Sequence, residues 1–569
     1  MDLTDVQKPM APAPILATHG LGLSALETFA HPSGALMGKW FVPSRIDTDP
    51  GHHIRVGLAA AIIIMVASWG VGWLPQTQNS WFAGTTVLNP LRFWTPGVTV
   101  CAVALVTGGL LLVRSWLRLG QALQLPYTTG SGATNVGSVK ESARKVRIND
   151  HKLTVINRAI LYWTVPLIFA FPIMSRDVFS YLAQGRLLHA GLDPYGEGVS
   201  SLPGWFMIGA DSLWAQSPSP YGPAFLLISQ FVWFVTNGGP EWAILFFRLL
   251  FLGGMAMCMW AIPRLARRFG VRGDWAQWIF IANPLFGLYM IAGAHNDTLM
   301  LGLLLTGLYF VNPHWAPLNH RRRRILLGFI LLGGSIAVKP LTVLVLPFAG
   351  MLLLWRPNTT ISYRARIAVW AKSVVVVGLL LAVLGAVTGL WFGWIPAMMT
   401  SGSAAFPYAP FGLLGLGIGW LVDLIWGTGT EPAAEVVYSL GTLAIAAVTA
   451  WLALLPKPKH PIFSAAIALT TAILAAPVFQ PWYVLWVLPL FVIAGAWRGW
   501  SSSLLYLLVA VLIVVGVVDQ LAVSQWIPLL PMRILTGTIG LIGLAILIFF
   551  DPLTRRAFPQ TRKTIQRVA

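Results

Sequence analysis

The stretch Met174-Ser-Arg-Asp-Val-Phe-Ser-Tyr-Leu-Ala-Gln-Gly-Arg186 directly follows a long apolar segment, where the chain is expected to leave a membrane. It contains Asp177, one of only 19 acidic residues in a chain of 569. A carboxylate at a membrane boundary is costly unless it is paired or takes part in function. Asp177, Ser180 and Gln184 fall on one face of a helix predicted from Asp177 to Ala190. We therefore expect this helix to lie on the membrane surface with its polar face toward a cavity.

The composition predicts an all-α polytopic membrane protein. Of the residues, 56% are hydrophobic and only 10% are charged. Apolar runs of bilayer-spanning length predict about 14 transmembrane helices, with surface-lying helices in a large first external loop. The net charge of +19 is typical of Lys and Arg in cytoplasmic loops, and it does not require a nucleic-acid partner.

The positive-inside rule orients these spans. Basic residues between Arg114 and Lys152 place that loop in the cytoplasm, so the Asp177 stretch lies outside. The apolar run 224–236 is interpreted as surface-lying or re-entrant, because a span there would put the arginines from Arg264 to Arg272 outside. We expect a plasma-membrane protein with both termini cytoplasmic and the active site facing outside. The predicted divisions are a cytoplasmic tail (1–54), a membrane module (55–392) with external loop 175–240, C-terminal membrane helices (393–552) with external loop 393–434, and a cytoplasmic tail (553–569).

The rare ionisable residues gather at the external ends of the predicted spans. Either of two carboxylates, Asp177 and Asp297, could remove a proton from an acceptor hydroxyl. Lys339, His295 and Arg176 could stabilise the charge of a departing phosphate. Pairing of the carboxylates with nearby cations is the structural alternative, as is snorkelling of Lys339 to the headgroups. The other candidates for contact with sugar or acceptor are Asn296, Asp193, Tyr181, Gln184, Tyr195, Tyr221, Gln480, Trp482 and Tyr483.

Motifs for soluble activated donors are missing from the sequence. There is no Gly-rich nucleotide loop and no Cys/His cluster with zinc spacing. The nearest pair of acidic residues with metal-binding spacing, Asp47 and Asp49, lies in the predicted cytoplasmic tail. We therefore expect no metal and no cofactor. An enzyme of this kind working outside needs an activated donor that resides in the membrane, and a sugar linked to a lipid phosphate fits this need.

Five short motifs resemble a known group of enzymes. They are Ser175-Arg-Asp-Val-Phe-Ser-Tyr-Leu-Ala-Gln-Gly185, Gly191-Leu-Asp-Pro-Tyr195, Ser219-Pro-Tyr-Gly-Pro223, Ala294-His-Asn-Asp297 and Gln480-Pro-Trp-Tyr483. The architecture resembles the GT-C superfamily of glycosyltransferases that use polyprenol-phosphate sugars. The motifs are similar to those of the actinobacterial α(1→6)-mannosyltransferases of lipomannan and lipoarabinomannan synthesis, over most of residues 55–550.

The resemblance implies a donor, an acceptor and a base. The donor is polyprenyl (decaprenyl) phosphate mannose, and the acceptor is a lipid-linked mannan or a phosphatidylinositol mannoside. Asp177 is the implied general base, and module 55–392 is the implied GT-C catalytic unit. The family pattern often has Asn where this chain has Asp193, which leaves the role of that position open. In the expected reaction, the acceptor 6-hydroxyl attacks the anomeric carbon in line and inverts it.

Three other functions compete with this interpretation. A transporter or flippase for a lipid-linked sugar needs polar residues at mid-membrane depth, whereas the unusual polar residues here lie at external boundaries. A transferase that uses another donor, such as polyprenyl phosphate arabinose, differs only in a few hydroxyl contacts. A non-enzymatic assembly subunit is the third alternative.

Overall fold

A computed structural model describes residues 45–557, apart from 76, 78, 83–84, 126–138, 313–319, 357–358, 401–408, 457–459 and 497–499. The described residues form helices connected by turns and loops, and no strand occurs among them. The predicted all-α class is therefore confirmed. Most of each predicted terminal tail falls outside the described residues, and so do residues 401–408 of the predicted external loop 393–434.

The helices before the middle of the chain are α3 (Pro50–Val71), α4 (Asn89–Arg92), α5 (Thr95–Ala122), α6 (Val139–Ile168), α7 (Asp177–His189), α8 (Pro223–Thr236), α9 (Pro240–Arg268), α10 (Gly273–Phe280), the π-helix η5 (Phe286–Ala292) and α11 (Asp297–Val311). Those that follow are α12 (Arg321–Val338), η8 (Pro340–Val345), α13 (Leu346–Met351), α14 (Tyr363–Thr388), α15 (Trp394–Thr400), α16 (Pro410–Trp426), α17 (Glu431–Leu454), α18 (Pro461–Ala475), η9 (Pro481–Tyr483), α19 (Val484–Ile493), α20 (Trp500–Asp519), α21 (Leu529–Ala545) and η10 (Ile546–Phe550). Short 3₁₀ turns are η2 (Arg45–Thr48), η3 (Val199–Ser201), η4 (Ser212–Trp214) and η11 (Thr554–Ala557).

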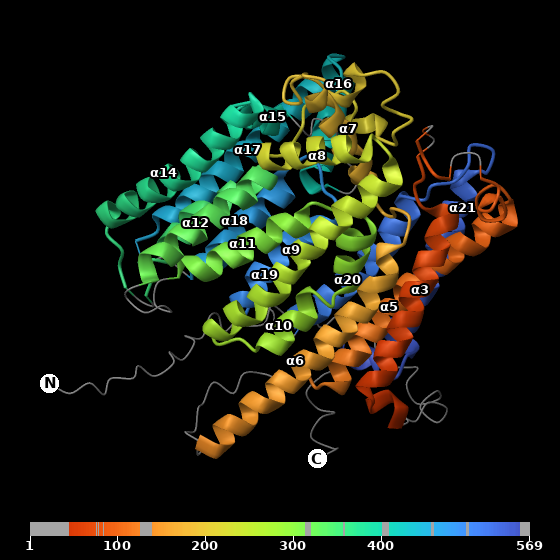
Figure 1. Ribbon diagram of the computed structural model, residues 1–569, viewed down its shortest axis with the longest axis horizontal. Helices are drawn as coiled ribbons and strands as arrows, with labels where there is room; N and C mark the ends of the chain where they lie inside the picture. Colours follow the sequence, from red (N-terminus) through yellow and green to blue (C-terminus); the bar gives the residue numbers. More distant parts are fainter. Residues whose placement is uncertain are drawn as a thin grey trace.

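The helices form one packed bundle (Figure 1). On one side α5 packs against α3, α20 and α21, while α3 also contacts α6. In the middle α11 lies between α9 and α12, and α12 in turn packs on α14. The remaining side is built from α16, α17 and α18. One large buried apolar cluster runs through most of these helices, and a second, small cluster among the described residues includes Ala183 and Leu187 of α7.

Seven helices of the described chain are long and apolar enough to cross a membrane, or eight if the bent pair η5 and α11 counts as one broken span. The seven are Pro50–Val71, Thr95–Ala122, Pro240–Arg268, Tyr363–Thr388, Glu431–Leu454, Ser501–Asp519 and Leu529–Phe550. The predicted number of about 14 is thus not confirmed, although a multi-pass membrane protein is. Several apolar runs are helical over fewer residues than a span requires. The run 341–355, which the sequence predicts as one span, is helical only through η8 and the six-residue α13, which ends at Met351.

Helix α7 confirms the helix predicted from Asp177, but its surroundings are more buried than expected for a surface helix. Val178 and Tyr181 on its apolar face are buried, and so are Ser180 and Gln184 on its polar face. It packs on α8 and α9. A Cβ added to Gly185 would stand 2.1 Å from the carbonyl oxygen of Ser229 in α8, so the close approach of the two helices depends on this glycine.

Helix α8 covers the apolar run 224–236, which the sequence predicts to be surface-lying or re-entrant rather than a membrane span. Its 14 residues give a length of about 21 Å, which is too short for a hydrocarbon core of about 30 Å. This length fits the predicted surface-lying or re-entrant helix.

Arginines mark one end of the central helices, and polar turns mark the other. Arg268 at the end of α9 and Arg324 in the first turn of α12 both lie over the ring of Tyr309, near the end of α11. The opposite ends of α11 and α12 carry Asp297 and Lys339. The 18 residues of α12 separate its two ends by about 27 Å.

Candidate active site

Asp177 is the first residue of α7, so its carboxylate lies at the positive end of the helix. The Ser175 hydroxyl oxygen accepts the backbone N–H of Asp177 at 3.1 Å. Three residues earlier, Met174 has a φ of +62°, in the left-handed region. Such a conformation costs a non-glycine residue about 1 kcal/mol or more, and it is found disproportionately at functional sites.

The neighbouring turn, between η5 and α11, delivers His295, Asn296 and Asp297. Its Ala294 also has a left-handed φ, of +54°. Together η5 and α11 form a pair bent by 112°, and the bend directs His295 toward Asp177. His295 Nδ1 lies 3.5 Å from Asp177 Oδ2 and 3.6 Å from Asp297 Oδ2. One imidazole nitrogen therefore stands between two carboxylates, within ion-pair distance of both but without a hydrogen bond to either.

Lys339 comes from a third turn, where α12 gives way to η8. Its ammonium donates to Asp297 Oδ1 at 2.7 Å. It also lies 4.7 Å from the Trp486 ring centre and 5.9 Å from that of Tyr221, a cation–π arrangement. The four charged or chargeable groups Asp177, His295, Asp297 and Lys339 form a continuous cluster, which we call the acid–base cluster.

Within the acid–base cluster only one carboxylate reaches the molecular surface. The Asp177 side chain is 21% exposed, whereas those of Asp297 and His295 are 0% exposed. Burial raises the pKa of the Asp177 carboxyl above its usual range, and the charges of His295 and Lys339 partly oppose this shift. A raised pKa makes a carboxylate a stronger base.

Several buried polar atoms next to the cluster have no hydrogen-bond partner among the described residues. They include His295 Nε2, Asn296 Nδ2 and the indole nitrogen of Trp482. Buried polar groups without partners are uncommon in folded proteins. Their concentration at this one place indicates where a polar ligand gains hydrogen bonds.

Four of the predicted aromatic residues line this region. The Trp482 ring lies 4.2 Å from His295, and Tyr483 stacks on Trp486 at 3.8 Å. The Tyr181 hydroxyl donates to Asn296 Oδ1 at 3.4 Å, and its ring meets Tyr221 edge to face at 5.1 Å.

Other predicted residues support the structure around the cluster. The Arg176 guanidinium donates to the carbonyls of Gly209 and Ala210, and it lies over the Trp73 ring. Gln184 Oε1 accepts the Ser219 hydroxyl at 2.9 Å. The Tyr195 hydroxyl donates to the Tyr221 carbonyl.

The last two predicted residues have less direct connections with the cluster. Asp193 lies beyond the far end of α7, and its carboxylate accepts the N–H of Tyr195 at 2.8 Å. Gln480 is buried just before η9, where its carbonyl accepts the N–H of Tyr483. For these residues a contact with substrate stays a prediction.

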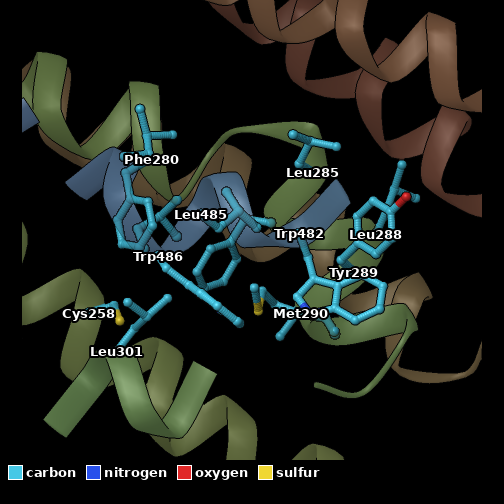
Figure 2. Close-up of a cluster of buried hydrophobic side chains, with 14 of the residues drawn as sticks. Cys258, Phe280, Leu285, Leu288, Tyr289, Met290, Leu301, Trp482, Leu485 and Trp486 are labelled. Carbon is cyan, nitrogen blue, oxygen red and sulfur yellow. The ribbon is translucent and has the colours of Figure 1, made fainter. Parts of the chain in front are cut away.

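Trp486 is a contact that the sequence did not reveal. Its indole N–H donates to Asp297 Oδ1 at 2.7 Å, the same oxygen that accepts from Lys339. Figure 2 shows Trp482 and Trp486 among buried apolar side chains that include Tyr289, Met290 and Leu301. Trp486 lies inside an apolar segment, so the composition of the sequence around it gives no sign of a polar role. Among the described residues, no group of three or more His, Cys, Asp or Glu side chains is arranged to hold a metal ion.

Two family models match the sequence of this chain. The family model described as "Alpha-(1->6)-mannopyranosyltransferase, N-terminal domain" matches residues 54–355, more than half of the chain. The chain belongs to this family. The model described as "MptB C-terminal domain" matches residues 410–546. The acid–base cluster of this mannosyltransferase lies in the first matched region, and Trp482, Tyr483 and Trp486 lie in the second.

Named relatives support the same assignment. A probable α-(1→6)-mannopyranosyltransferase of Mycolicibacterium smegmatis is 32% identical over 76% of this chain and 77% of its own length. An α-(1→6)-mannopyranosyltransferase of Mycobacterium tuberculosis is 31% identical over 80% of each chain. The α-(1→6)-mannopyranosyltransferase A of the same organism is 28% identical over 77% of this chain and 79% of its own. No solved structure matches the mannosyltransferase.

Proposed function

We propose that the protein transfers mannose from polyprenyl phosphate mannose to the 6-hydroxyl of a lipid-anchored α(1→6)-mannan, with Asp177 as the general base. The main observation that supports this proposal is the exposure of the Asp177 side chain. It is the one carboxylate of the acid–base cluster with exposed side-chain surface, so it can meet a hydroxyl without rearrangement of the buried pair Asp297–Lys339.

The proposed step balances protons and charge. Asp177 takes the proton of the acceptor 6-hydroxyl while the oxygen attacks the anomeric carbon of mannose. The bond from that carbon to the phosphate oxygen breaks, and polyprenyl phosphate leaves with the bonding electron pair. A single in-line displacement inverts the anomeric centre, so a β-linked donor gives an α-linked product.

The leaving phosphate is proposed to lie near Lys339 and His295. Lys339 has three N–H donors, and Asp297 accepts from the ammonium at 2.7 Å. The Nε2 atom of His295 has no hydrogen-bond partner among the described residues, and the His295 ring lies 4.2 Å from the Trp482 ring. Both groups can donate to phosphate oxygens as negative charge develops on them. Because Arg176 contacts loop carbonyls, we propose that it acts on the loop rather than on phosphate.

Asp297 is proposed to orient its neighbours rather than to contact the acceptor. It is fully buried, and one of its oxygens accepts from both Lys339 and Trp486. We propose that Asn296 and the aromatic residues Tyr181, Tyr221, Trp482 and Tyr483 form the sugar site beside it.

The external location is proposed from the two ends of the bundle. The ends of α9 and α12 marked by Arg268 and Arg324 lie on the same side, around Tyr309. Lys339 lies at the other end of α12, about 27 Å away along its axis, which is close to the hydrocarbon thickness. Since basic helix ends favour the cytoplasm, the acid–base cluster is assigned to the external face.

An assay in proteoliposomes tests the proposal. Purified protein receives labelled polyprenyl phosphate mannose and a short α(1→6)-mannoside, and the product is identified by its linkage and anomeric configuration. We expect one added α(1→6)-mannose and release of polyprenyl phosphate. Transfer only from polyprenyl phosphate arabinose would replace the donor, and movement of the lipid-linked sugar across the bilayer without release of polyprenyl phosphate would refute the proposal.

A further inference from the structure

Arg248 is a buried cation that the proposed reaction does not use. It lies in α9, a candidate membrane-spanning helix, and its side chain is 3% exposed. A charge at such a position is expensive unless it is satisfied by other groups. No carboxylate in the described part of the chain forms an ion pair with it; instead, its partners are backbone carbonyls.

Four carbonyls accept hydrogen bonds from the Arg248 guanidinium. Nε donates to Ile291 O at 3.0 Å, and Nη2 donates to Ala292 O at 2.5 Å. Nη1 donates at 2.6 Å to both Ile168 O and Ala170 O. Ile168 ends α6 and Ala292 ends η5, so the cation lies at the negative ends of two helices, which stabilises it.

These two helix ends lead directly into the two turns of the acid–base cluster. From Ala170 the chain passes through the strained Met174 to Asp177, and from Ala292 it passes through the strained Ala294 to His295. Strained backbone persists only where the surrounding structure holds it. One side chain thus fixes both turns relative to each other just before they present Asp177 and His295.

We infer that Arg248 is a positioning residue of the mannosyltransferase, which sets the distance between Asp177 and His295 by joining the ends of α6 and η5. This inference rests on the proposed role of Asp177. The planar guanidinium directs N–H donors toward two chain segments at once. A lysine ammonium is a compact point charge and cannot reproduce this arrangement of donors.

The test compares Arg248→Lys with Arg366→Lys. Arg366 is a matched control because it too is buried and donates to backbone carbonyls, those of Ile361 just before α14 and of Ala453, Leu455 and Pro456 at the end of α17. For each variant, kcat and donor KM are measured against pH with monodisperse protein. A misplacement of about 1 Å at a reacting centre can lower a rate about 100-fold, so we expect kcat of Arg248→Lys to fall by about that factor with little change in KM.

The pH profile separates positioning from a general loss of structure. The groups that act on Asp177 are His295, Lys339, Asp297 and the Ser175 hydroxyl. If His295 moves away from Asp177 in Arg248→Lys, its positive charge opposes protonation of Asp177 less, and the acidic limb of kcat moves to higher pH. Arg366→Lys is expected to keep the wild-type limb and kcat.

A second variant, Arg248→Ala, distinguishes a loss of positioning from misfolding. Arg248→Ala leaves a space for a guanidinium ion, so added guanidinium at low millimolar concentration is expected to restore part of kcat, whereas ammonium is not. Wild-type kcat and an unmoved acidic limb in Arg248→Lys would overturn the inference. Failure of both Arg248 variants to give any monodisperse protein would also overturn it, because the residue would then serve folding alone.

Different experimental results would refute the proposed function and the positioning role of Arg248. Full activity of Asp177→Asn would remove the assigned base, whatever Arg248 does. An inactive Asp177→Asn together with a normal Arg248→Lys would leave the base in place and refute only the positioning role.

Discussion

His295 Nδ1 lies 3.5 Å from Asp177 Oδ2, although the two residues come from separate turns at the ends of η5 and α6. The same nitrogen lies 3.6 Å from Asp297 Oδ2. An imidazole between two carboxylates links the exposed carboxylate to the buried one. This arrangement makes the protonation of Asp177 depend on His295. It also places the proposed base, Asp177, next to the proposed phosphate-binding residue His295.

The first prediction concerns pH. Transfer requires the ionised form of Asp177, and burial raises the pKa of this carboxyl. Activity should therefore fall as the pH is lowered through a value above about 3.9, the ordinary pKa of aspartate. His295→Gln removes a positive charge that favours the ionised form, so its acidic limb should lie at higher pH than that of the wild type. Measurement of kcat against pH for both proteins decides this; a limb that moves to lower pH in His295→Gln would contradict the account.

A second prediction separates two roles of Lys339. Lys339→Met leaves the fully buried Asp297 carboxylate without its cation, and breaking a buried pair in this way costs about 3–5 kcal/mol. The double variant Lys339→Met/Asp297→Asn should recover most of this stability, as measured by unfolding in detergent.

The donor KM of the same double variant tests whether Lys339 also binds the donor phosphate. If Lys339 also binds the donor phosphate, the double variant should keep a raised KM although it folds normally. A wild-type donor KM in the double variant would restrict Lys339 to its pairing with Asp297.

The third prediction concerns Trp486. Trp486→Phe removes the indole donor to the Asp297 carboxylate, and the loss of a hydrogen bond to a charged group costs about 2 kcal/mol. Both thermal stability and kcat should fall, because Asp297 and Lys339 lose a common anchor. Trp370→Phe is the matched control, since the indole of Trp370 in α14 donates to the carbonyl of Pro347 in α13. That variant should lose stability but keep kcat, and an equal loss of kcat in both would remove the assigned role of Trp486.

A fourth prediction tests the contact of α7 with α8. In Gly185→Val the new side chain would overlap the Ser229 carbonyl, which lies 2.1 Å from an added Cβ. The helix that carries Asp177 must then shift, so we expect lower stability and at least a tenfold loss of kcat. Gly378→Ala in α14 is the control, because nothing lies within 4 Å of its added Cβ and alanine favours a helix by up to about 1 kcal/mol. Wild-type kcat in Gly185→Val would show that the contact is dispensable.

The sequence was most informative where a polar residue followed an apolar run. Asp177, His295, Asp297 and Lys339 were predicted as site residues because their charges lie at the ends of predicted spans, and the structure brings these four together. The start of α7 at Asp177 was predicted correctly from the periodicity of its polar and apolar residues. Which cation pairs with which carboxylate depends on how turns far apart in the chain meet, and hydropathy does not contain that information.

Sequence patterns were least informative inside the apolar segments. Hydropathy measures how apolar a run is, and it does not register where a helix ends, so segment 341–355 is predicted as a span although its helical part, η8 and α13, ends at Met351. For the same reason Arg248 and Trp486 were hidden within predicted spans. Their partners are backbone carbonyls and a distant carboxylate, which only the folded structure brings within reach.

The most direct test of the central claim is transfer by Asp177→Asn. Labelled polyprenyl phosphate mannose and a short α(1→6)-mannoside are supplied to purified wild type and variant, and the initial rates are compared. Removal of the base should lower the rate by about 10²–10⁴-fold, the range of general-base catalysis. Because burial disfavours the ionised carboxylate, the variant should melt at the same temperature as the wild type or higher at neutral pH. A rate close to that of the wild type, in a variant that folds normally, would contradict the account.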